Sequence, residues 1–300
     1  DHLSCNTIEG NVEQMGFSLP LTLQRFESKL PGNTALPSTE EELKALAALD
    51  KGNYKYKVED YFAKPKASAF QLSPNGKYLS YMEKDDAGKR HVYVKEIATG
   101  TVKRAIEEKD ELIKGYGWIN DERLFFVMDK GGNENYHLFA SNIDGSNTRD
   151  LTPFDGVKAS ILNMLKEQKD YMIISMNKNN PQIFEPYKLN VVTGELTQLY
   201  ENKDAANPIQ GYEFDKDGEL RGYSRLVNGI ESELYYKDLA TGEFRLLKKT
   251  HWDDTFGVIA FNYASKNKDE AYVLTNLDSD KTRIVLYDLQ QNQNIREILA

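Results

Sequence analysis

Two segments of the sequence place a serine two residues after a glycine, as the nucleophile turn of many hydrolases does. They are Gly16–Pro20 and Gly222–Leu226, with Ser18 and Ser224 at their centres. The full G-x-S-x-G pattern has a second glycine, which the tight strand-to-helix turn requires to expose the hydroxyl. Neither segment has that second glycine, and Ser224 falls within a predicted strand. We therefore expect no catalytic residue in these 300 residues.

The four histidines are the next candidates for acid–base chemistry. They are His2, His91, His137 and His251. His91 and His137 occupy near-equivalent positions in two successive repeats, so we interpret them as partly exposed strand residues. His251 stands beside Trp252 in a predicted loop, where simple packing accounts for it.

Candidate ligands for a metal or cofactor are few. Cys5 is the single cysteine, which excludes a disulfide framework and a cysteine zinc site. Two stretches, Asp215–Gly218 and Asp278–Asp280, resemble pieces of calcium loops, but they lie at expected turns and lack the downstream glutamate. The acidic runs Glu40–Glu42 and Glu107–Glu108 are interpreted as a solvated helix start and a loop. With no G-x-G-x-x-G or P-loop lysine, we predict no metal and no cofactor.

The charge balance excludes further classes of partner. Acidic residues number 47 against 38 basic ones, which gives a net charge of -9. Such a chain is a poor match for a nucleic-acid backbone. No stretch approaches the roughly 18 apolar residues of a transmembrane helix. We predict no nucleic-acid partner and no membrane span.

One sequence pattern recurs five times: an apolar strand, a polar turn and a second short strand. Its turns fall at residues 100, 145, 194, 242 and 292, with separations of 45, 49, 48 and 50 residues. Each period also contains an earlier pair of strands, joined by turns such as Ser73–Gly76 and Asp215–Gly218. Their glycines supply the positive φ that tight hairpins require. The sequence therefore predicts four strands per period.

Four strands in about 45 residues are typical of a β-propeller blade. One such sheet cannot bury both faces alone, but stacked sheets bury them against each other. We predict an all-β propeller with blades at about 67–108, 112–152, 156–202, 209–250 and 255–300. Residues 1–66 are predicted to form an N-terminal arm with one short helix, capped within Ser38–Glu41. Leu19-Pro20 is expected to break any long element in the arm.

Three segments resemble the prolyl oligopeptidase family, in particular its acylaminoacyl-peptidase and dipeptidyl-aminopeptidase branches. Val58–Pro65 is similar to the lead into the family's first blade, and Phe70–Tyr81 to the S-P-D-G-K hairpin that follows. Asp129–Leu138 is similar to the G-D-E-N hairpin of the second blade, with Asn133 in place of the usual aspartate. The S-P-D-G motif also occurs in TolB-type propellers. The stronger indication of the family is therefore that the first-blade and second-blade motifs occur together and in this order.

The resemblance implies a propeller of seven or eight blades that caps a C-terminal α/β-hydrolase domain with a Ser-Asp-His triad. The propeller would limit access to small peptides, and some members hold the substrate's amino terminus with its side chains. None of the family's catalytic residues is matched here. Glu134 is the candidate for substrate contact, and the alternative is that it only hydrogen-bonds its own hairpin.

The leading hypothesis is thus the substrate-gating propeller of a serine peptidase, whose partners are a peptide and a hydrolase domain beyond residue 300. The alternative is a stand-alone TolB-like propeller that binds a peptide or protein, with Tyr54–Phe62 as a closing strand. A glycan-processing propeller ranks third. The acidic chain and the missing initiator methionine favour a periplasmic or secreted protein over a cytoplasmic one. Leu3–Cys5 resembles the end of a lipoprotein signal, but whether Cys5 is a lipid anchor stays open, as does the oligomeric state.

Overall fold

The computed structural model describes residues 7–14, 17–24, 37, 39–49, 52 and 55–299. The chain divides into two compact units, Asp1–Lys64 and Pro65–Ala300. Cys5 and His2 lie outside the described residues, so the structure does not bear on the lipid-anchor expectation. Among the described helices, none combines the length and apolar character that crossing a membrane would need.

The first unit contains more secondary structure than expected. Strands β1 (Thr7–Gln14) and β2 (Phe17–Gln24) form an antiparallel hairpin, and Pro20 lies inside β2. A proline is tolerated there because each strand of a two-stranded sheet keeps one open edge. The expectation that Leu19-Pro20 would break the element was therefore wrong.

Two helices follow, where one was predicted. Helix α1 (Glu40–Ala48) begins after Thr39, whose hydroxyl accepts from the Glu42 N–H at 3.2 Å. The capping box is thus Thr39 with Glu42, one residue later than expected. Helix α2 (Val58–Phe62) occupies the end of the Tyr54–Phe62 segment, so this part of the arm is not the closing strand that the TolB-like alternative required.

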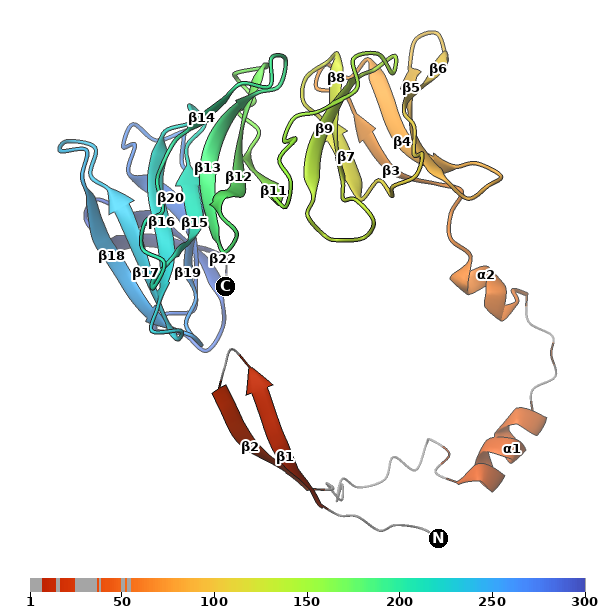
Figure 1. The fold of residues 1–300 in the computed structure, drawn as a ribbon. Coiled ribbons are helices and arrows are strands. Elements are labelled where there is room, and N and C mark those ends of the chain that lie inside the picture. Colours follow the sequence, from red (N-terminus) through yellow and green to blue (C-terminus); the bar gives the residue numbers. More distant parts are fainter. Residues whose placement is uncertain are drawn as a thin grey trace. The chain divides into compact units, whose positions relative to one another are not determined.

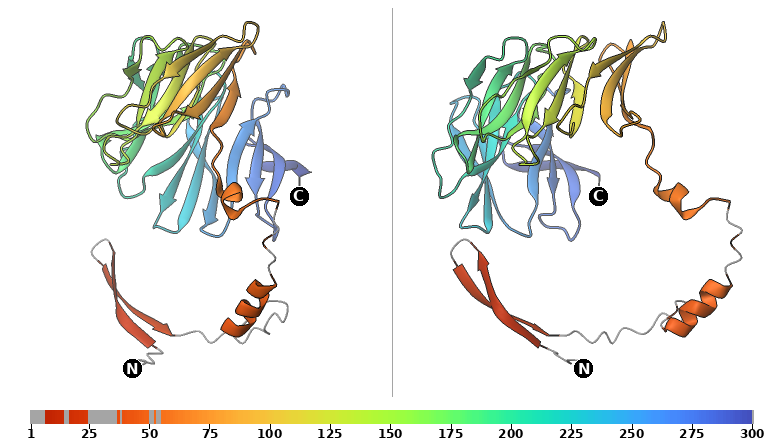
Figure 2. Two further views of the ribbon diagram at one scale, coloured as in Figure 1. Left: turned by 90° about the vertical axis from the view of Figure 1, so that its right-hand side faces the viewer. Right: turned by 45° about the vertical axis from the view of Figure 1, so that its right-hand side comes forward.

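The second unit is built from five four-stranded antiparallel sheets in chain order, shown in Figure 1 and from two other sides in Figure 2. The first sheet comprises β3 (Ala67–Leu72), β4 (Tyr78–Lys84), β5 (Arg90–Glu96) and β6 (Val102–Ile106). The second comprises β7 (Gly115–Trp118), β8 (Arg123–Met128), β9 (His137–Asn142) and β10 (Arg149–Asp150). The third comprises β11 (Ala159–Asn163), β12 (Tyr171–Asn180), β13 (Ile183–Asn190) and β14 (Leu196–Gln198).

The last two sheets repeat this plan. The fourth comprises β15 (Ile209–Phe214), β16 (Leu220–Val227), β17 (Glu231–Lys237) and β18 (Phe244–His251). The fifth comprises β19 (Phe256–Phe261), β20 (Glu270–Thr275), β21 (Arg283–Asp288) and β22 (Gln293–Leu299). Each sheet pairs its strands in sequence order, so every connection within it is a hairpin. The predicted all-β fold of four-stranded propeller blades is confirmed.

The recurring turns have the backbone geometry that their residues suggested. Gly100, Gly145, Gly194 and Gly242 have φ of 73°, 86°, 79° and 76°, and Asn292 has 54°. Only glycine adopts this left-handed region freely, and asparagine is the side chain that tolerates it best. At Gly145 the turn also approaches the first sheet, because a Cβ there would lie 2.9 Å from the Arg104 carbonyl oxygen.

Buried hydrophobic clusters join most neighbouring sheets. One packs Val92 and Val94 of the first sheet against Leu124 and Phe126 of the second. A second spans sheets two and three, and a third spans sheets four and five. Within the described part of the chain, no such cluster joins the third sheet to the fourth.

Hydrogen bonds between first-hairpin turns add a second link along the series. Each joins the turn between the first two strands of one sheet to the same turn of the next. The bonds are Asn75 N–H to Asp121 at 2.8 Å, Asn120 to the Lys169 carbonyl at 3.0 Å, Gln168 to the Asp217 carbonyl at 2.8 Å and Lys216 N–H to Tyr263 at 2.7 Å.

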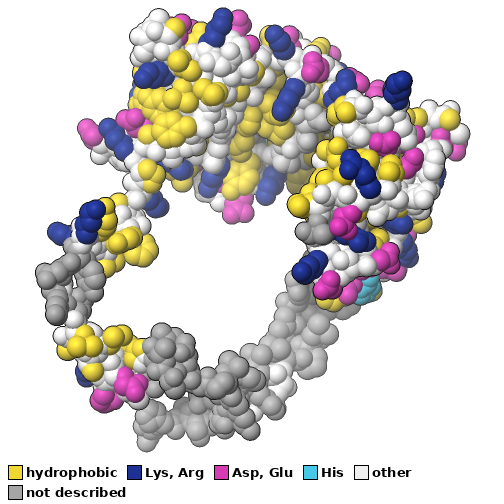
Figure 3. All heavy atoms as spheres, turned by 180° about the vertical axis from the view of Figure 1, so that it is seen from behind, with side chains coloured by type: hydrophobic (Ala, Val, Ile, Leu, Met, Phe, Trp, Pro, Cys, Tyr) yellow, Lys and Arg dark blue, Asp and Glu magenta, His cyan; other side chains and the backbone are white. Residues whose placement is uncertain are grey.

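The outward face of the first sheet carries aromatic side chains. The rings of Phe70, Tyr81 and Tyr93 stack across three strands with centroids 5.6 and 5.8 Å apart. Phe70 and Leu72 remain more than half exposed, and hydrophobic side chains gather on the surface there (Figure 3). This face differs from the opposite one, which packs against the second sheet.

Candidate functional site

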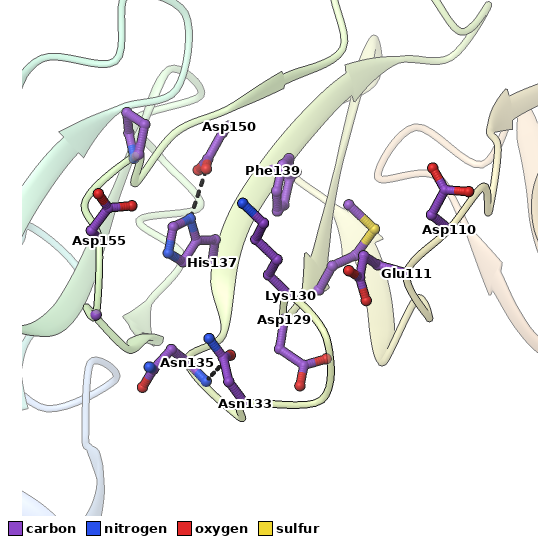
Figure 4. Close-up of a pocket in the computed structure, with 13 residues that line it drawn as sticks. Asp110, Glu111, Asp129, Lys130, Asn133, Asn135, His137, Phe139, Asp150 and Asp155 are labelled. Carbon is purple, nitrogen blue, oxygen red and sulfur yellow. Dashed lines mark hydrogen bonds and ion pairs between the residues drawn. The ribbon is translucent and has the colours of Figure 1, made fainter.

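A pocket of about 470 Å³ opens at one end of the second sheet (Figure 4). Three segments form its walls: the connection from β6 to β7, the loop from β8 to β9, and the connection from β10 to β11. Each segment joins strands of a packed sheet, so the scaffold fixes both ends of every wall. The loop from β8 to β9 is the segment in which the sequence resembles the G-D-E-N hairpin.

Buried and backbone-bonded groups hold this loop in shape. Asp129 is 6% exposed, and its carboxylate accepts from the Glu134 N–H at 2.9 Å. Glu111, from the first wall, accepts from the Gly131 N–H at 2.9 Å. Gly131 and Gly132 have positive φ, and so does Glu134 at 58°. The loop is therefore an ordered turn in which carboxylates satisfy backbone donors.

A histidine–carboxylate pair forms the opposite wall. The Nδ1 atom of His137 lies 2.7 Å from Asp150 Oδ2, and both side chains are about one-fifth to one-quarter exposed. The second oxygen of Asp150 accepts from the Thr152 N–H at 2.8 Å, which fixes the carboxylate. Figure 4 shows the imidazole turned toward Asp150, with Phe139 beside it on β9. This geometry orients His137 but leaves it without a hydroxyl or thiol to activate.

The pocket is acidic. Asp110, Glu111, Asp129, Asp150 and Asp155 line it, against Lys130 and His137. Among the described residues, Asp110 and Asp155 have no hydrogen-bond or ion-pair partner. Figure 4 shows them on opposite sides of the pocket, with His137, Lys130 and Phe139 between them, so each offers a separate acceptor for a cationic group.

The lining residues suit binding rather than covalent chemistry. They include no serine, threonine or cysteine that could attack a carbonyl group. No group of three or more His, Cys, Asp or Glu side chains that could hold a metal is found among the residues that the structure describes.

Glu134, the predicted substrate contact, lies on the pocket loop and is exposed. Its backbone N–H is bonded to Asp129, whereas its carboxylate has no partner among the described residues. The hairpin is thus held by the main chain of Glu134 and by Asp129, and the Glu134 side chain is not needed for it. Whether it contacts substrate stays a prediction.

The interpretation of His91 was wrong, because this residue is buried rather than partly exposed. Its Nδ1 accepts from the Glu108 N–H at 3.1 Å, so its Nε2 carries the proton toward Asp85 at 3.2 Å. Glu108 is also buried, and its two oxygens accept from the Arg90 and Ile113 N–H groups. These hydrogen bonds link the start of β5 to the connection that follows β6. They have a structural role and do not form a reactive site.

The other candidates lie apart from the pocket. Ser224 is inside β16 and Ser18 inside β2, as strand residues rather than nucleophile turns. Asp215 and Asp278 fall at hairpin turns, where Asp215 accepts from the Asp217 and Glu219 N–H groups at 3.0 Å. His251 was predicted in a loop, but it is the last residue of β18, where it is exposed and its Nδ1 lies 2.8 Å from Asp253.

Sequence reasoning missed the carboxylates that line the pocket. Asp110, Asp129, Asp150 and Asp155 all lie at the ends of strands of the second blade or in its connections. Strand pairing brings these ends together, so the signal was their shared position at one end of a predicted sheet.

Fold and pocket together define a β-propeller domain similar to the propeller region of the prolyl oligopeptidase family. The chain is similar to dipeptidyl aminopeptidase BIII of Pseudoxanthomonas mexicana, with 30% identity over 162 residues, 53% of this chain and 23% of that protein. It is also similar to dipeptidyl peptidase family member 6 of Caenorhabditis elegans, with 25% identity over 260 residues, 80% of this chain and 34% of that protein. The matched regions thus span about a quarter to a third of these relatives. No protein-family model matches the chain.

Solved structures agree on the fold. A prolyl endopeptidase structure superposes with a TM-score of 0.56 and 17% identity, over 78% of this chain and 36% of that one. Prolyl oligopeptidase B of Galerina marginata superposes with a TM-score of 0.51 and 12% identity, over 97% of this chain and 40% of that one. The predicted resemblance to the family's propeller is confirmed.

Proposed function

We propose that this chain is the substrate-gating propeller of a serine peptidase that hydrolyses short peptides in the manner of dipeptidyl- or acylaminoacyl-peptidases. The catalytic α/β-hydrolase domain would belong to the same polypeptide beyond residue 300. The observation that carries the proposal is the acidic pocket, because it is built on the loop that resembles the family's second-blade hairpin. Similarity to two dipeptidyl peptidases supports the same substrate class.

The pocket would hold the free amino terminus of the peptide. A terminal ammonium group donates hydrogen bonds, and Asp110 and Asp155, on opposite sides of the pocket, each offer carboxylate oxygens that no group in the described part of the chain occupies. Glu134, at the loop surface, would add a third carboxylate contact. Asp129 and Glu111 would act indirectly, because their oxygens are engaged in holding the loop.

The stacked sheets would act as the gate. Apolar cores join the first to the second and the second to the third sheet, so the walls on both sides of the pocket are set by packed sheets. A rigid enclosure of this kind admits short extended peptides and excludes folded proteins.

The proposal is tested on the full-length polypeptide. We expect it to react with a fluorophosphonate probe at one serine and to cleave a dipeptidyl chromogenic amide. Acetylation of the substrate's amino terminus should reduce kcat/KM by about tenfold or more, since it removes a charge-assisted contact. Failure of the probe to label any serine would refute the peptidase assignment.

A pair of variants separates the pocket from general charge effects. The double change Asp110→Asn and Asp155→Asn should lower kcat/KM for the free-amino substrate about tenfold while sparing the acetylated one. Asp86→Asn, an exposed carboxylate in the first sheet's hairpin turn, is the matched control and should change neither. Equal losses on both substrates would contradict the role given to the pocket.

A further inference from the structure

A second cavity, of about 510 Å³, lies between the third and fourth sheets. Ser160 and Leu162 of β11 and Ser175 of β12 form one wall, and Gln210 and Tyr212 of β15 the facing one. We call this cavity the inter-sheet cleft. It occupies the one junction between consecutive sheets at which the described residues form no buried hydrophobic cluster.

The walls of the inter-sheet cleft combine apolar side chains with hydroxyl and amide groups, and they carry almost no charge. The hydroxyls of Ser160 and Ser175 lie 2.7 Å apart, so one donates to the other and the acceptor keeps a free O–H. The side-chain amides of Gln182 and Gln210 have no hydrogen-bond partner among the described residues. Such unoccupied donors and acceptors match the backbone of an extended peptide.

Lys158 is the single charged residue that lines the inter-sheet cleft. Its ammonium group lies 5.3 Å from the centre of the Tyr136 ring, and no carboxylate is within ion-pair distance among the residues described. Its backbone N–H is bonded to Asn177 at 2.7 Å, which anchors the position of the residue. A lysine without an ion-pair partner in a cleft that is otherwise uncharged favours an anionic group of a ligand.

The cleft and the acidic pocket are neighbours along the chain. Gly156 lines the pocket and Lys158 lines the cleft, two residues further on. The Ala159 N–H bonds the Tyr136 carbonyl at 2.8 Å, which ties this segment to the pocket loop. Carboxylates on one side of this segment and a lysine on the other complement a molecule with a cationic and an anionic end.

We propose that the inter-sheet cleft binds the carboxyl-terminal part of a short peptide, with Lys158 pairing with the terminal carboxylate. The hydroxyls and amides of the cleft would bond the peptide backbone, and Leu162 and Phe184 would contact an uncharged side chain. This assignment rests on the proposed function, because it takes the ligand to be a peptide whose amino terminus occupies the acidic pocket.

The test measures binding of a pentapeptide with uncharged side chains, four alanines and one tyrosine, and with free termini to the 300-residue chain by titration calorimetry. Amidation of its carboxyl terminus should raise Kd about tenfold. Lys158→Gln should raise Kd for the free acid by a similar factor and leave Kd for the amide unchanged. Lys158→Arg should retain the preference for the free acid.

Matched control variants separate peptide binding in the inter-sheet cleft from nonspecific effects of substitution. Lys166→Gln removes an exposed lysine of the same sheet's first hairpin and should not alter Kd. Ser160→Phe should block the cleft, whereas Thr197→Phe, on the exposed β14 strand, should not. Thermal unfolding confirms that each variant is folded before binding is compared.

The outcomes distinguish the two proposals. If amidation weakens binding equally in Lys158→Gln and the unchanged chain, the cleft assignment is overturned. If acetylation of the amino terminus has no effect while amidation does, the role of the acidic pocket fails and that of the cleft stands. If the pentapeptide does not bind in either form, both are overturned.

Discussion

The buried carboxylate of Asp129 accepts a hydrogen bond from the backbone N–H of Glu134, 2.9 Å away, and so closes the loop that walls the acidic pocket. Glu134 has φ of 58°, a conformation that costs a non-glycine residue about 1–2 kcal/mol. A hydrogen bond to a charged group contributes about 1.5–3 kcal/mol. Asp129 therefore offsets the backbone strain at Glu134, which lies between the lining residues Asn133 and Asn135 but does not itself line the pocket.

Removal of that acceptor should loosen the loop. In Asp129→Ala the Glu134 N–H loses its partner, so its hydrogen exchange should accelerate about tenfold or more. Exchange measured by NMR or mass spectrometry reports this directly. Asp155→Ala removes a pocket carboxylate that bonds no backbone group, and it should leave exchange unchanged. Equal acceleration in both variants would contradict the positioning role of Asp129.

Two turn glycines form a matched pair for a stability test. Both Gly100 and Gly145 have positive φ, so alanine at either should cost about 1 kcal/mol. A Cβ at Gly100 meets no atom within 4 Å, whereas at Gly145 it would lie 2.9 Å from a backbone carbonyl of the first sheet. We expect Gly145→Ala to lower the free energy of unfolding by about 1 kcal/mol more, as measured in urea. Equal costs would show that the two sheets do not approach closely at this turn.

Arg221 should be the most sensitive charged residue at the junction of the fourth and fifth sheets. Its side chain is 5% exposed and lies 3.5 Å from Asp215 and 3.3 Å from Asp269. Arg221→Met leaves those carboxylates without their cation, which should cost about 3–5 kcal/mol in urea unfolding. Arg225→Met, at a partly exposed pair with Glu233, should cost only about 1 kcal/mol. A cost at Arg221 no larger than that at Arg225 would refute this interpretation.

Glu213 should make stability depend on pH. Burial on β15 raises the pKa of its carboxyl from 4.5 to about 7. The folded state favours the neutral carboxyl. The contribution of Glu213 to stability is therefore fully present below about pH 4.5, the ordinary pKa, and is lost as pH rises through about 7, the pKa in the folded state. Glu213→Gln should therefore raise the free energy of unfolding at pH 8 by about 2–3 kcal/mol and change it little at pH 4. The same gain at both pH values would rule out titration of Glu213 as the cause.

Much of the propeller could be predicted because its determinants are local. Gly145 and Gly242 mark turns whose positive φ is set by residue type, and the continuous apolar runs Leu124–Met128 and Tyr171–Met176 lie in the internal strands β8 and β12. Their regular spacing then gave the number of sheets. The turn residues, the apolar runs and their spacing all involve residues close together along the chain, so they can be recognised in a single sequence.

The site was less predictable because it depends on groups that are distant in sequence. The buried His91 is bonded to Glu108, 17 residues further on in the connection from β6 to β7, as well as to Asp85 in the turn before its own strand. Asp129 bonds a backbone group rather than exposing its charge, a role that residue type alone does not reveal. The β1–β2 hairpin was missed because Pro20 was weighed as a break without regard to the open edges of a two-stranded sheet.

The junction between the third and fourth sheets also has a thermodynamic consequence. In stacked repeats, cooperativity passes from one unit to the next through the interface that they share. At this junction the ring of Tyr200, which follows β14, packs against Tyr212, Tyr223 and Phe244 of the fourth sheet. The first three sheets are therefore coupled to the last two in part through one aromatic side chain, so truncation of Tyr200 would weaken the cooperativity of unfolding between them.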